Sequence, residues 1–300
     1  MNELYAADPS VCIHASELKL LLASFGPYAG RYLANYPSDW VTQVERQLGN
    51  LGEIEAARVK TMLRRAKENM ALIPWNGLAW DKEQEWLVNA RPLLNTAPAV
   101  FVGLIAREAK PPAIHRLHDF DLPPTAEERV AGTASEYARI SKILLLLSPE
   151  IALVDPYLHP LKSNCAAVLK AMFDTAAKGK CQKITLWARA AEICGNGVYA
   201  VIKADLEACL RQLARQAGFK PGREIEMILV EDETAQAKMH GRYLLSIKGG
   251  IRFDQGFKQL PQGRHVDVGP VGKPPHDALL DIYFNGKHDM RLVERLAFKC

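Results

Sequence analysis

A histidine and an arginine two positions apart, His240 and Arg242, have the residue types and spacing best suited to chemistry in this chain. They begin the segment KMHGRYLLSIKGGIRFDQGFK (238–258), in which glycines separate two short apolar runs, a pattern that predicts a β-hairpin. We expect His240 to open the first strand, 248–250 to form the turn, and both side chains to share one face. A neutral imidazole beside a fixed cation suits a phosphate ester, because the imidazole can attack phosphorus or carry a proton while the guanidinium holds the oxygens.

The same part of the chain is strongly basic. Between Lys238 and Arg264 there are six cations and one anion, Asp254, whereas the net charge of the whole chain is only +4. Local positive potential of this kind attracts polyanions. A solvated hairpin with ordinary surface lysines is the alternative interpretation. Apart from Arg242, the candidate phosphate- and nucleic-acid-binding residues are Lys238, Lys248, Arg252, Lys258 and Arg264.

The segment resembles the motif of the phospholipase D superfamily, in which H-x-K is followed by four residues, an aspartate and a Gly-Ser-x-Asn-like turn. His240 matches the histidine, Arg242 takes the lysine position and Ile247 the aspartate position, while 254–257 lies near the turn. The closer resemblance is to a divergent H-x-R branch that includes the C-terminal domain of eukaryotic MIT-domain proteins. This resemblance covers roughly residues 145–300. It implies a phospholipase-D-like fold and the binding of phosphorylated ligands rather than their cleavage.

In the enzymes that this chain resembles, the histidine would form a phosphohistidine, and two copies of the motif meet within one chain or across a dimer. One copy is found here, so catalysis by this route would need a homodimer in which the two His240 side chains face each other. Arg242 would be a good phosphate clamp and a poor acid. Ile247 cannot orient the histidine as a carboxylate could. A structural role, with a satisfied hydrogen bond, is the alternative for His240.

Asp155 is the third candidate catalytic residue. It follows the apolar run 151–154, which predicts a short buried strand. Ligands of α/β sheets bind beside the carboxyl ends of parallel strands, so this position suits a site residue that orients His240 or Arg242. Capping of the following helix is the alternative role.

The chain divides at a proline-rich stretch with Pro111-Pro112 and Pro123-Pro124, which places a helical N-terminal region at 1–125 and a second domain at 126–300. Three tryptophans of the first region, Trp75, Trp80 and Trp86, are more typical of core anchors than of stacking on bases. The predicted helices of that region are 15–23, 53–67 and 81–91.

In the second domain, strands alternate with helices, which predicts an α/β fold with a mixed phospholipase-D-like sheet and flanking helices. A helix over 127–147 leads into it. The expected strands are 151–154, 183–187, 224–230, the two of the hairpin, 266–268 and 278–284. The expected helices between them are 161–178 and 199–217.

No metal or cofactor is predicted. His115, His118, Asp119 and Asp121 have the residue types of metal ligands, but the prolines around them indicate a surface linker. There is no Walker A motif and no G-x-G-x-x-G after a strand. The six scattered cysteines and the lack of a secretory signal or a long apolar run predict a cytoplasmic protein with reduced thiols.

These features favour recognition of a phosphodiester polyanion, DNA or RNA, through His240, Arg242 and the basic segment. The resemblance implies a role in a bacterial antiviral defence or mobile-element system. One alternative is a metal-independent nuclease or phosphodiesterase that uses His240 in a homodimer. Another is a non-catalytic interaction module whose helical N-terminal region docks a partner protein. Phosphoinositide binding ranks below these, because no amphipathic membrane helix is evident.

Overall fold

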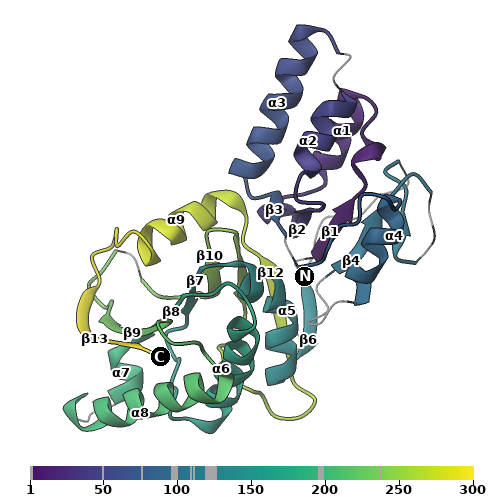
Figure 1. The fold of residues 1–300 in the computed structure, drawn as a ribbon. Helices are drawn as coiled ribbons and strands as arrows, with labels where there is room; N and C mark the ends of the chain where they lie inside the picture. The colour runs from purple at the N-terminus through teal and green to yellow at the C-terminus, as the bar shows by residue number, and fades with distance from the viewer. Residues whose placement is uncertain are drawn as a thin grey trace. The chain divides into compact units, whose positions relative to one another are not determined.

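The computed structural model describes residues 3–48, 51–75, 77–95, 101–108, 110, 112–118, 127–194, 199–236 and 238–300. The chain forms two compact units, Asn2–Thr125 and Ala126–Cys300 (Figure 1). Each unit combines helices with a β-sheet, which confirms the α/β class. None of the helices in the described ranges is long and apolar enough to cross a membrane.

The N-terminal unit is built on a five-stranded sheet, so the prediction of a mainly helical region is wrong. Its strand order is β3-β2-β1-β4-β5, and all neighbouring strands are parallel. The strands are β1 (Glu3–Ala7), β2 (Arg31–Asn35), β3 (Leu72–Pro74), β4 (Phe101–Ile105) and β5 (Ile114–His115). They are short and mostly buried. They therefore lack the polar–apolar alternation by which a strand is recognised in a sequence.

Helices of the N-terminal unit cover this sheet. They are α1 (Ala15–Ala23), α2 (Trp40–Gln47), α3 (Glu53–Glu68) and α4 (Trp86–Ala90). The first three share one core with the sheet, in which Leu18, Trp40 and Leu63 are buried. The helix predicted over 81–91 is confined to α4. Asp81 accepts a hydrogen bond from the amide of Glu83 (3.0 Å) and forms a turn instead.

The three clustered tryptophans are packing residues, as their sequence setting predicts. Trp86 is buried. Trp75 meets Phe101 edge to face at 4.9 Å between ring centroids, and Trp80 meets Tyr36 in the same way at 5.7 Å. Such contacts use the ring edges and faces that base stacking would need.

The C-terminal unit contains an eight-stranded mixed sheet of order β13-β9-β8-β7-β10-β11-β12-β6. Its strands are β6 (Glu128–Ala131), β7 (Glu150–Val154), β8 (Lys183–Arg189), β9 (Glu224–Glu231), β10 (Arg242–Ser246), β11 (Gly249–Phe253), β12 (His265–Pro270) and β13 (Arg291–Lys299). The central strands β7, β8 and β9 are parallel, and every other pairing is antiparallel. The expected strands at 151–154, 183–187, 224–230 and 266–268 are confirmed.

The described residues of this unit also form the helices α5 to α9, and Figure 1 shows α9 on one side of the sheet and α6 and α8 on the other. They are α5 (Ala134–Leu147), α6 (Ser163–Ala177), α7 (Ala190–Cys194), α8 (Tyr199–Ala217) and α9 (Lys273–Tyr283). The strand expected over 278–284 is therefore wrong, because that segment lies mainly in α9. The buried His276 of this helix places Nε2 2.9 Å from the carbonyl oxygen of Ser246 on β10.

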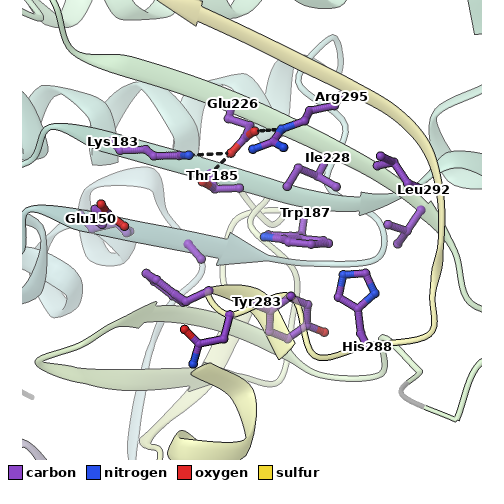
Figure 2. Close-up of a pocket in the computed structure, with 16 residues that line it drawn as sticks. Glu150, Lys183, Thr185, Trp187, Glu226, Ile228, Tyr283, His288, Leu292 and Arg295 are labelled. Atoms are coloured by element: carbon purple, nitrogen blue, oxygen red, sulfur yellow. Dashed lines mark hydrogen bonds and ion pairs between the residues drawn. The ribbon is translucent and has the colours of Figure 1, made fainter. Parts of the chain in front are cut away.

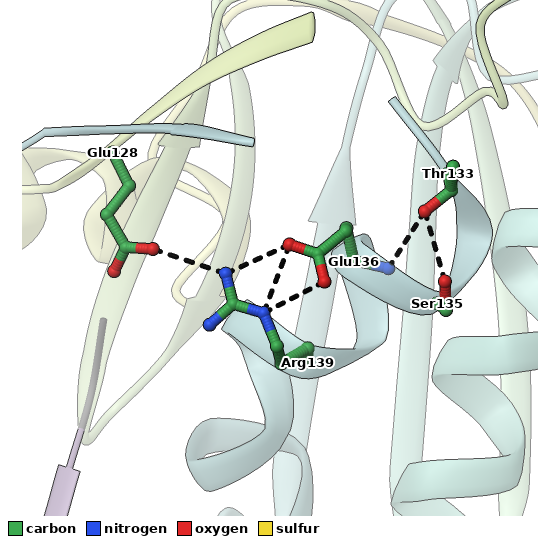
Figure 3. Close-up of polar contacts among 5 residues, drawn as sticks. All are labelled: Glu128, Thr133, Ser135, Glu136 and Arg139. Carbon is green, nitrogen blue, oxygen red and sulfur yellow. Dashed lines mark hydrogen bonds and ion pairs between the residues drawn. The ribbon is translucent and has the colours of Figure 1, made fainter. Parts of the chain in front are cut away.

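The helix predicted over 127–147 is wrong in its first part, which forms β6 and pairs with β12. The helix begins only after Thr133, whose hydroxyl accepts a hydrogen bond from the amide of Glu136 (3.3 Å). Figure 3 shows Arg139 bridging Glu136 and Glu128, which ties the first turns of α5 to the neighbouring strand. The N-cap and this bridge fix where the strand ends and the helix begins.

Gly179 marks a tight passage between α6 and β8, and Gly179→Ala is expected to destabilise the protein by about 3 kcal/mol. A Cβ atom there would lie 2.5 Å from the Cα of Leu146 and would also overlap its carbonyl oxygen. That oxygen cannot move away freely, because it accepts a hydrogen bond from the amide of Lys180 (2.8 Å). The matched control is Gly272→Ala, where nothing lies within 4 Å; Gly272 is the N-cap of α9, so the change should cost about 1 kcal/mol or less. Urea-induced unfolding of the two variants measures the difference; equal stabilities would contradict this account.

Candidate functional site

The carboxyl ends of β7, β8 and β9 lie at one end of the C-terminal sheet, which we call the carboxyl rim. Val154 pairs with Trp187, and Arg189 pairs with Val230, so the three strands end together. Strand β10 runs antiparallel to β7 and begins at the same rim, where Tyr243 pairs with Val154. The fold therefore brings Asp155, Arg242 and the approach to β10 to one place, where ligands of parallel sheets bind.

Asp155 anchors this rim from inside. Its carboxylate is only 2% exposed and accepts hydrogen bonds from the amides of Tyr157 (2.9 Å) and Phe257 (2.8 Å). It also lies 3.8 Å from Nε of Arg242. Asp155 thus holds the segment after β11 against β7 and orients Arg242. Within the described chain it makes no hydrogen bond or ion pair with His240.

Arg242 is held on several sides and still reaches solvent. Its Nη1 donates to the carbonyl oxygen of Asp254 (3.2 Å), and its guanidinium carbon lies 5.4 Å from the centre of the Tyr157 ring. The Nε group faces Asp155, and Nη2 makes no hydrogen bond to any described residue. The side chain is 26% exposed. A guanidinium that is already oriented loses little conformational freedom when it binds an anion.

His240 precedes β10 instead of opening it, so the prediction that strand alternation aligns it with Arg242 is wrong. Its amide donates to the carbonyl oxygen of Lys238 (3.1 Å), which closes a three-residue turn. Its side chain is exposed. The histidine is therefore presented by a turn at the rim.

Two residues that the sequence analysis did not select, Arg189 and Asp232, hold that turn. Arg189 binds the Asp232 carboxylate through Nε (2.8 Å) and Nη2 (3.0 Å). The same Nη2 donates to the carbonyl oxygen of Met239 (2.7 Å), and the Met239 amide donates to Asp232 (2.7 Å). Both polar groups of the buried residue before His240 are thereby satisfied. Arg189 and Asp232 lie at the carboxyl ends of the parallel strands β8 and β9. Asp155 was selected in the sequence because of such a position, so the same signal could have identified these two residues.

Asp232 is ionised in this arrangement. Burial alone would raise its pKa, but the hydrogen bonds from Arg189 and from the Met239 amide outweigh burial, and the pKa lies below its ordinary value. A pocket of about 280 Å³ opens beside His240, and its wall also includes the acidic residues Glu192 and Glu233. The His240 side of the rim is therefore mixed in charge.

The Arg242 side of the rim is more cationic. Helix α6 begins after Lys162, and its first turn is tied to the segment after β11 by a hydrogen bond from the Gln259 amide to the Asn164 carbonyl (2.9 Å). Burial raises the pKa of Cys165 in that turn, and the charges of Lys162 and Lys258 partly oppose this rise. Lys162 directly precedes this turn and Lys258 directly precedes Gln259, so the chain brings both cations close to it. The amides of Ser163 and Asn164 donate to no described residue, and a helix start of this kind favours anions.

The predicted basic residues do not form one patch. Lys238 lines the pocket beside His240, and Lys258 precedes Gln259, which is bonded to the first turn of α6; Arg264 is exposed just before β12, two strands away from β10. Lys248 instead lies in the hairpin turn at the opposite end of β10, where burial and the charge of Lys180 lower its pKa. Arg252 forms an ion pair with Glu127. The turn predicted at 248–250 is also wrong, because β11 already begins at Gly249.

Ile247, which occupies the aspartate position of the phospholipase D motif, is exposed in the same hairpin turn. It therefore lies at the end of β10 opposite to His240. A residue at position 247 therefore cannot orient His240. The Arg189–Asp232 pair contacts the turn that contains His240.

The H-x-x-H-D-x-D segment falls only partly within the described residues. His115 lies in β5, and Nε2 of His118 lies 3.5 Å from Glu17. Asp119 and Asp121 lie outside the described residues. Among the residues that the structure describes, no group of three or more His, Cys, Asp or Glu side chains could hold a metal ion.

Comparison with known proteins adds little to this geometry. No protein-family model matches the chain, and no curated protein matches it. Among solved structures, the chain is similar to TrmBL2, described as an archaeal chromatin protein with a novel mode of DNA binding. The match has 13% sequence identity and a TM-score of 0.28, and it covers 84% of this chain and 68% of that one. A similarity of this size carries no information on function.

Proposed function

We propose that the carboxyl rim of the C-terminal unit binds the phosphodiester backbone of DNA or RNA, as a phospholipase-D-like recognition module. The observation that carries this proposal is the state of Arg242. Its guanidinium is oriented by Asp155, Asp254 and Tyr157, yet it is partly exposed and keeps Nη2 free of partners among the described residues. A planar fork in this state suits phosphate oxygens, which it can bind through two parallel hydrogen bonds.

The surroundings of Arg242 support the same ligand. Lys162, Lys258 and the amides at the start of α6, which bond to no described residue, add positive potential on one side, and the exposed His240 adds a donor on the other. All of these groups suit phosphate oxygens, and none of them points to a particular base. We therefore expect binding through the backbone, with strong dependence on salt and little dependence on sequence.

The test is the affinity of the full chain for labelled single-stranded DNA, duplex DNA and RNA, measured by fluorescence anisotropy over a range of salt concentrations. Arg242→Ala is expected to weaken binding by about ten- to a hundredfold, because a charge-assisted hydrogen bond contributes about 1.5–3 kcal/mol. The slope of log affinity against log salt should become shallower by about one. Arg252→Ala is the matched control, since Arg252 lies on the same hairpin and pairs with Glu127. Equal effects of the two substitutions, or salt-insensitive binding, would contradict the proposal.

The nuclease alternative is tested in the same series with His240→Ala in EDTA. Under the proposed function, this variant still retains the strands and neither protein cleaves them. Cleavage by the wild type that the substitution abolishes would instead establish a metal-independent nuclease in which His240 acts as nucleophile.

A further inference from the structure

A second cavity lies on the face of the C-terminal sheet that α9 partly covers. It measures about 370 Å³, within the range of small-molecule sites. Strands β7, β8, β9 and β13 form its floor, and the chain that follows α9, through Gly286 and His288, forms a wall. Toward one end it reaches Glu150 and Lys183, the first residues of β7 and β8.

Trp187 lies in the middle of this cavity with an unsatisfied donor. Its side chain is buried, at 5% exposure, and its indole Nε1 has no hydrogen-bond partner among the described residues. Nδ1 of His288, which also lines the cavity, is buried and equally without a partner. Buried polar groups are almost always hydrogen-bonded, so two unsatisfied ones at a single cavity point to a ligand.

The two ends of the cavity differ in character. Figure 2 shows Trp187 between these two ends. One end is ionic and contains Lys183, Glu226 and Arg295, whereas the other lies at Leu292. The indole nitrogen of Trp187 is on the ionic side. The rings of Tyr283 and His288 meet the indole edge to face, at 5.2 and 5.6 Å between centroids. These two rings already cover part of the indole, so a planar group in the cavity would meet ring edges and the Nε1 side of Trp187.

The charges around Glu226 at the ionic end are paired with one another, while Glu150 is exposed. Glu226 is 2% exposed and accepts hydrogen bonds from Thr185 (3.3 Å) and Arg295, and it pairs with Lys183 at 3.0 Å. Burial would raise the pKa of Glu226, but its partners outweigh burial and lower it, so the carboxylate is ionised. Lys183 is further paired with Glu224 at 3.2 Å. A ligand with a net charge would have to break one of these pairs in a partly buried place, which is costly.

We propose that this cavity binds an uncharged planar heterocycle of nucleobase or nucleoside size. Its ring would lie among Trp187, Tyr283 and His288, and a ring nitrogen or carbonyl oxygen would accept the hydrogen bond that Trp187 Nε1 offers. The site is separate from Arg242 and does not rest on the proposed nucleic-acid binding. Edge and face contacts with aromatic side chains tolerate many ring systems, so the class of ligand is defined by planarity, an acceptor atom and the absence of charge.

The experiment uses the full chain labelled with 5-fluorotryptophan, whose five tryptophans give five ¹⁹F resonances. Trp187 is the only tryptophan between residues 126 and 300, and its resonance is assigned with Trp187→Phe. Adenosine, uridine and nicotinamide are titrated separately, with glucose as the non-planar comparison. The expected result is a saturable shift of the Trp187 resonance by at least one heterocycle, with the other four resonances unchanged. No shift up to the solubility limit of each heterocycle, or a shift by glucose alone, would overturn the proposal.

Two variants test the location. Ile228→Phe fills the cavity from β9 and is expected to weaken binding by at least about tenfold. Leu292→Tyr narrows it at an exposed position, so its folding is not in question. The matched control is Val102→Phe, an exposed strand residue of the other unit. Wild-type affinity in both cavity variants would show that the ligand binds elsewhere and would reject the site.

Discussion

Asp232→Ala lowers the free energy of unfolding of the C-terminal unit by about 4 kcal/mol, the largest single effect that we expect. The substitution removes the acceptor for two hydrogen bonds from Arg189 and one from the Met239 amide. It leaves a guanidinium and a buried N–H without their partner, and both costs add to the lost interactions. Since the same contacts hold the residue before His240, the variant also loosens the turn that presents the histidine.

Urea-induced unfolding, followed at the ¹⁹F resonance of 5-fluorotryptophan at Trp187, measures this loss in the C-terminal unit. The matched control is Asp277→Ala, which removes an exposed pair with Lys273 and should change stability by less than about 1 kcal/mol. If the two variants unfold at the same urea concentration, the Arg189–Asp232 pair does not hold the turn.

The stabilisation that the Asp232 carboxylate provides is expected to decrease at low pH. The pKa of Asp232 is lower in the folded protein than its ordinary value, near 3.9 in an unfolded chain. Its stabilising contribution is therefore fully present above about pH 4 and is lost as the pH falls through the folded-state pKa. The stability difference between wild type and Asp232→Asn should accordingly narrow below about pH 4. A difference that widens with acidification would show that the carboxylate is not stabilised by its partners.

Asp155→Ala is expected to cost about 3 kcal/mol and to weaken oligonucleotide binding, although Asp155 is too deeply buried to contact a ligand. The amides of Tyr157 and Phe257 would lose their acceptor, and Arg242 would lose the carboxylate that orients it. Asp155 thus acts as a positioning residue for Arg242.

Two measurements distinguish the positioning of Arg242 by Asp155 from a general contribution of Asp155 to stability. Urea unfolding reports the loss of stability, with Asp174→Ala, a half-exposed pair with Lys170, as the control. Binding is measured at a temperature at which the variant is folded, in the wild-type and Arg242→Ala backgrounds. If Asp155 acts through Arg242, its removal weakens binding only when Arg242 is present. Equal loss in both backgrounds would show that Asp155 supports the rim as a whole.

The fold of the C-terminal unit could be predicted where local signals agree with tertiary context. The apolar runs of β7, β8 and β9 are bounded by turn residues, and α8 was predicted with its observed bounds. The prediction failed at α9, because Leu279 to Phe284 has a strand-like composition. The prolines 274 and 275 in its first turn were the overlooked helix signal. The prediction of secondary structure also failed in the N-terminal unit. Its parallel strands are two to five residues long and mostly buried, so they show no alternation of polar and apolar residues.

The site was partly predictable for a related reason. Asp155 was found because strand-end carboxylates are recognisable from the sequence. The pairing of Arg189 with Asp232, and of both with Met239, depends on the register between β8 and β9 and on the path of the loop after β9. No local pattern encodes contacts between residues 43 and 50 positions apart, as the Arg189 contacts are. No local pattern encodes the separation of Lys248 from the rim either, because it follows from the length of β10.

The order of strands in the eight-stranded sheet has a consequence for how this unit is made. Its two outermost strands, β6 and β13, are the first and the last of that sheet in the chain. During synthesis, β9 keeps a row of unpaired backbone groups until Arg291–Lys299 have left the ribosome, and β6 has no partner until β12 arrives. An exposed strand edge invites pairing with other chains. We therefore expect the nascent unit to be open to pairing with other chains until its final strand is in place.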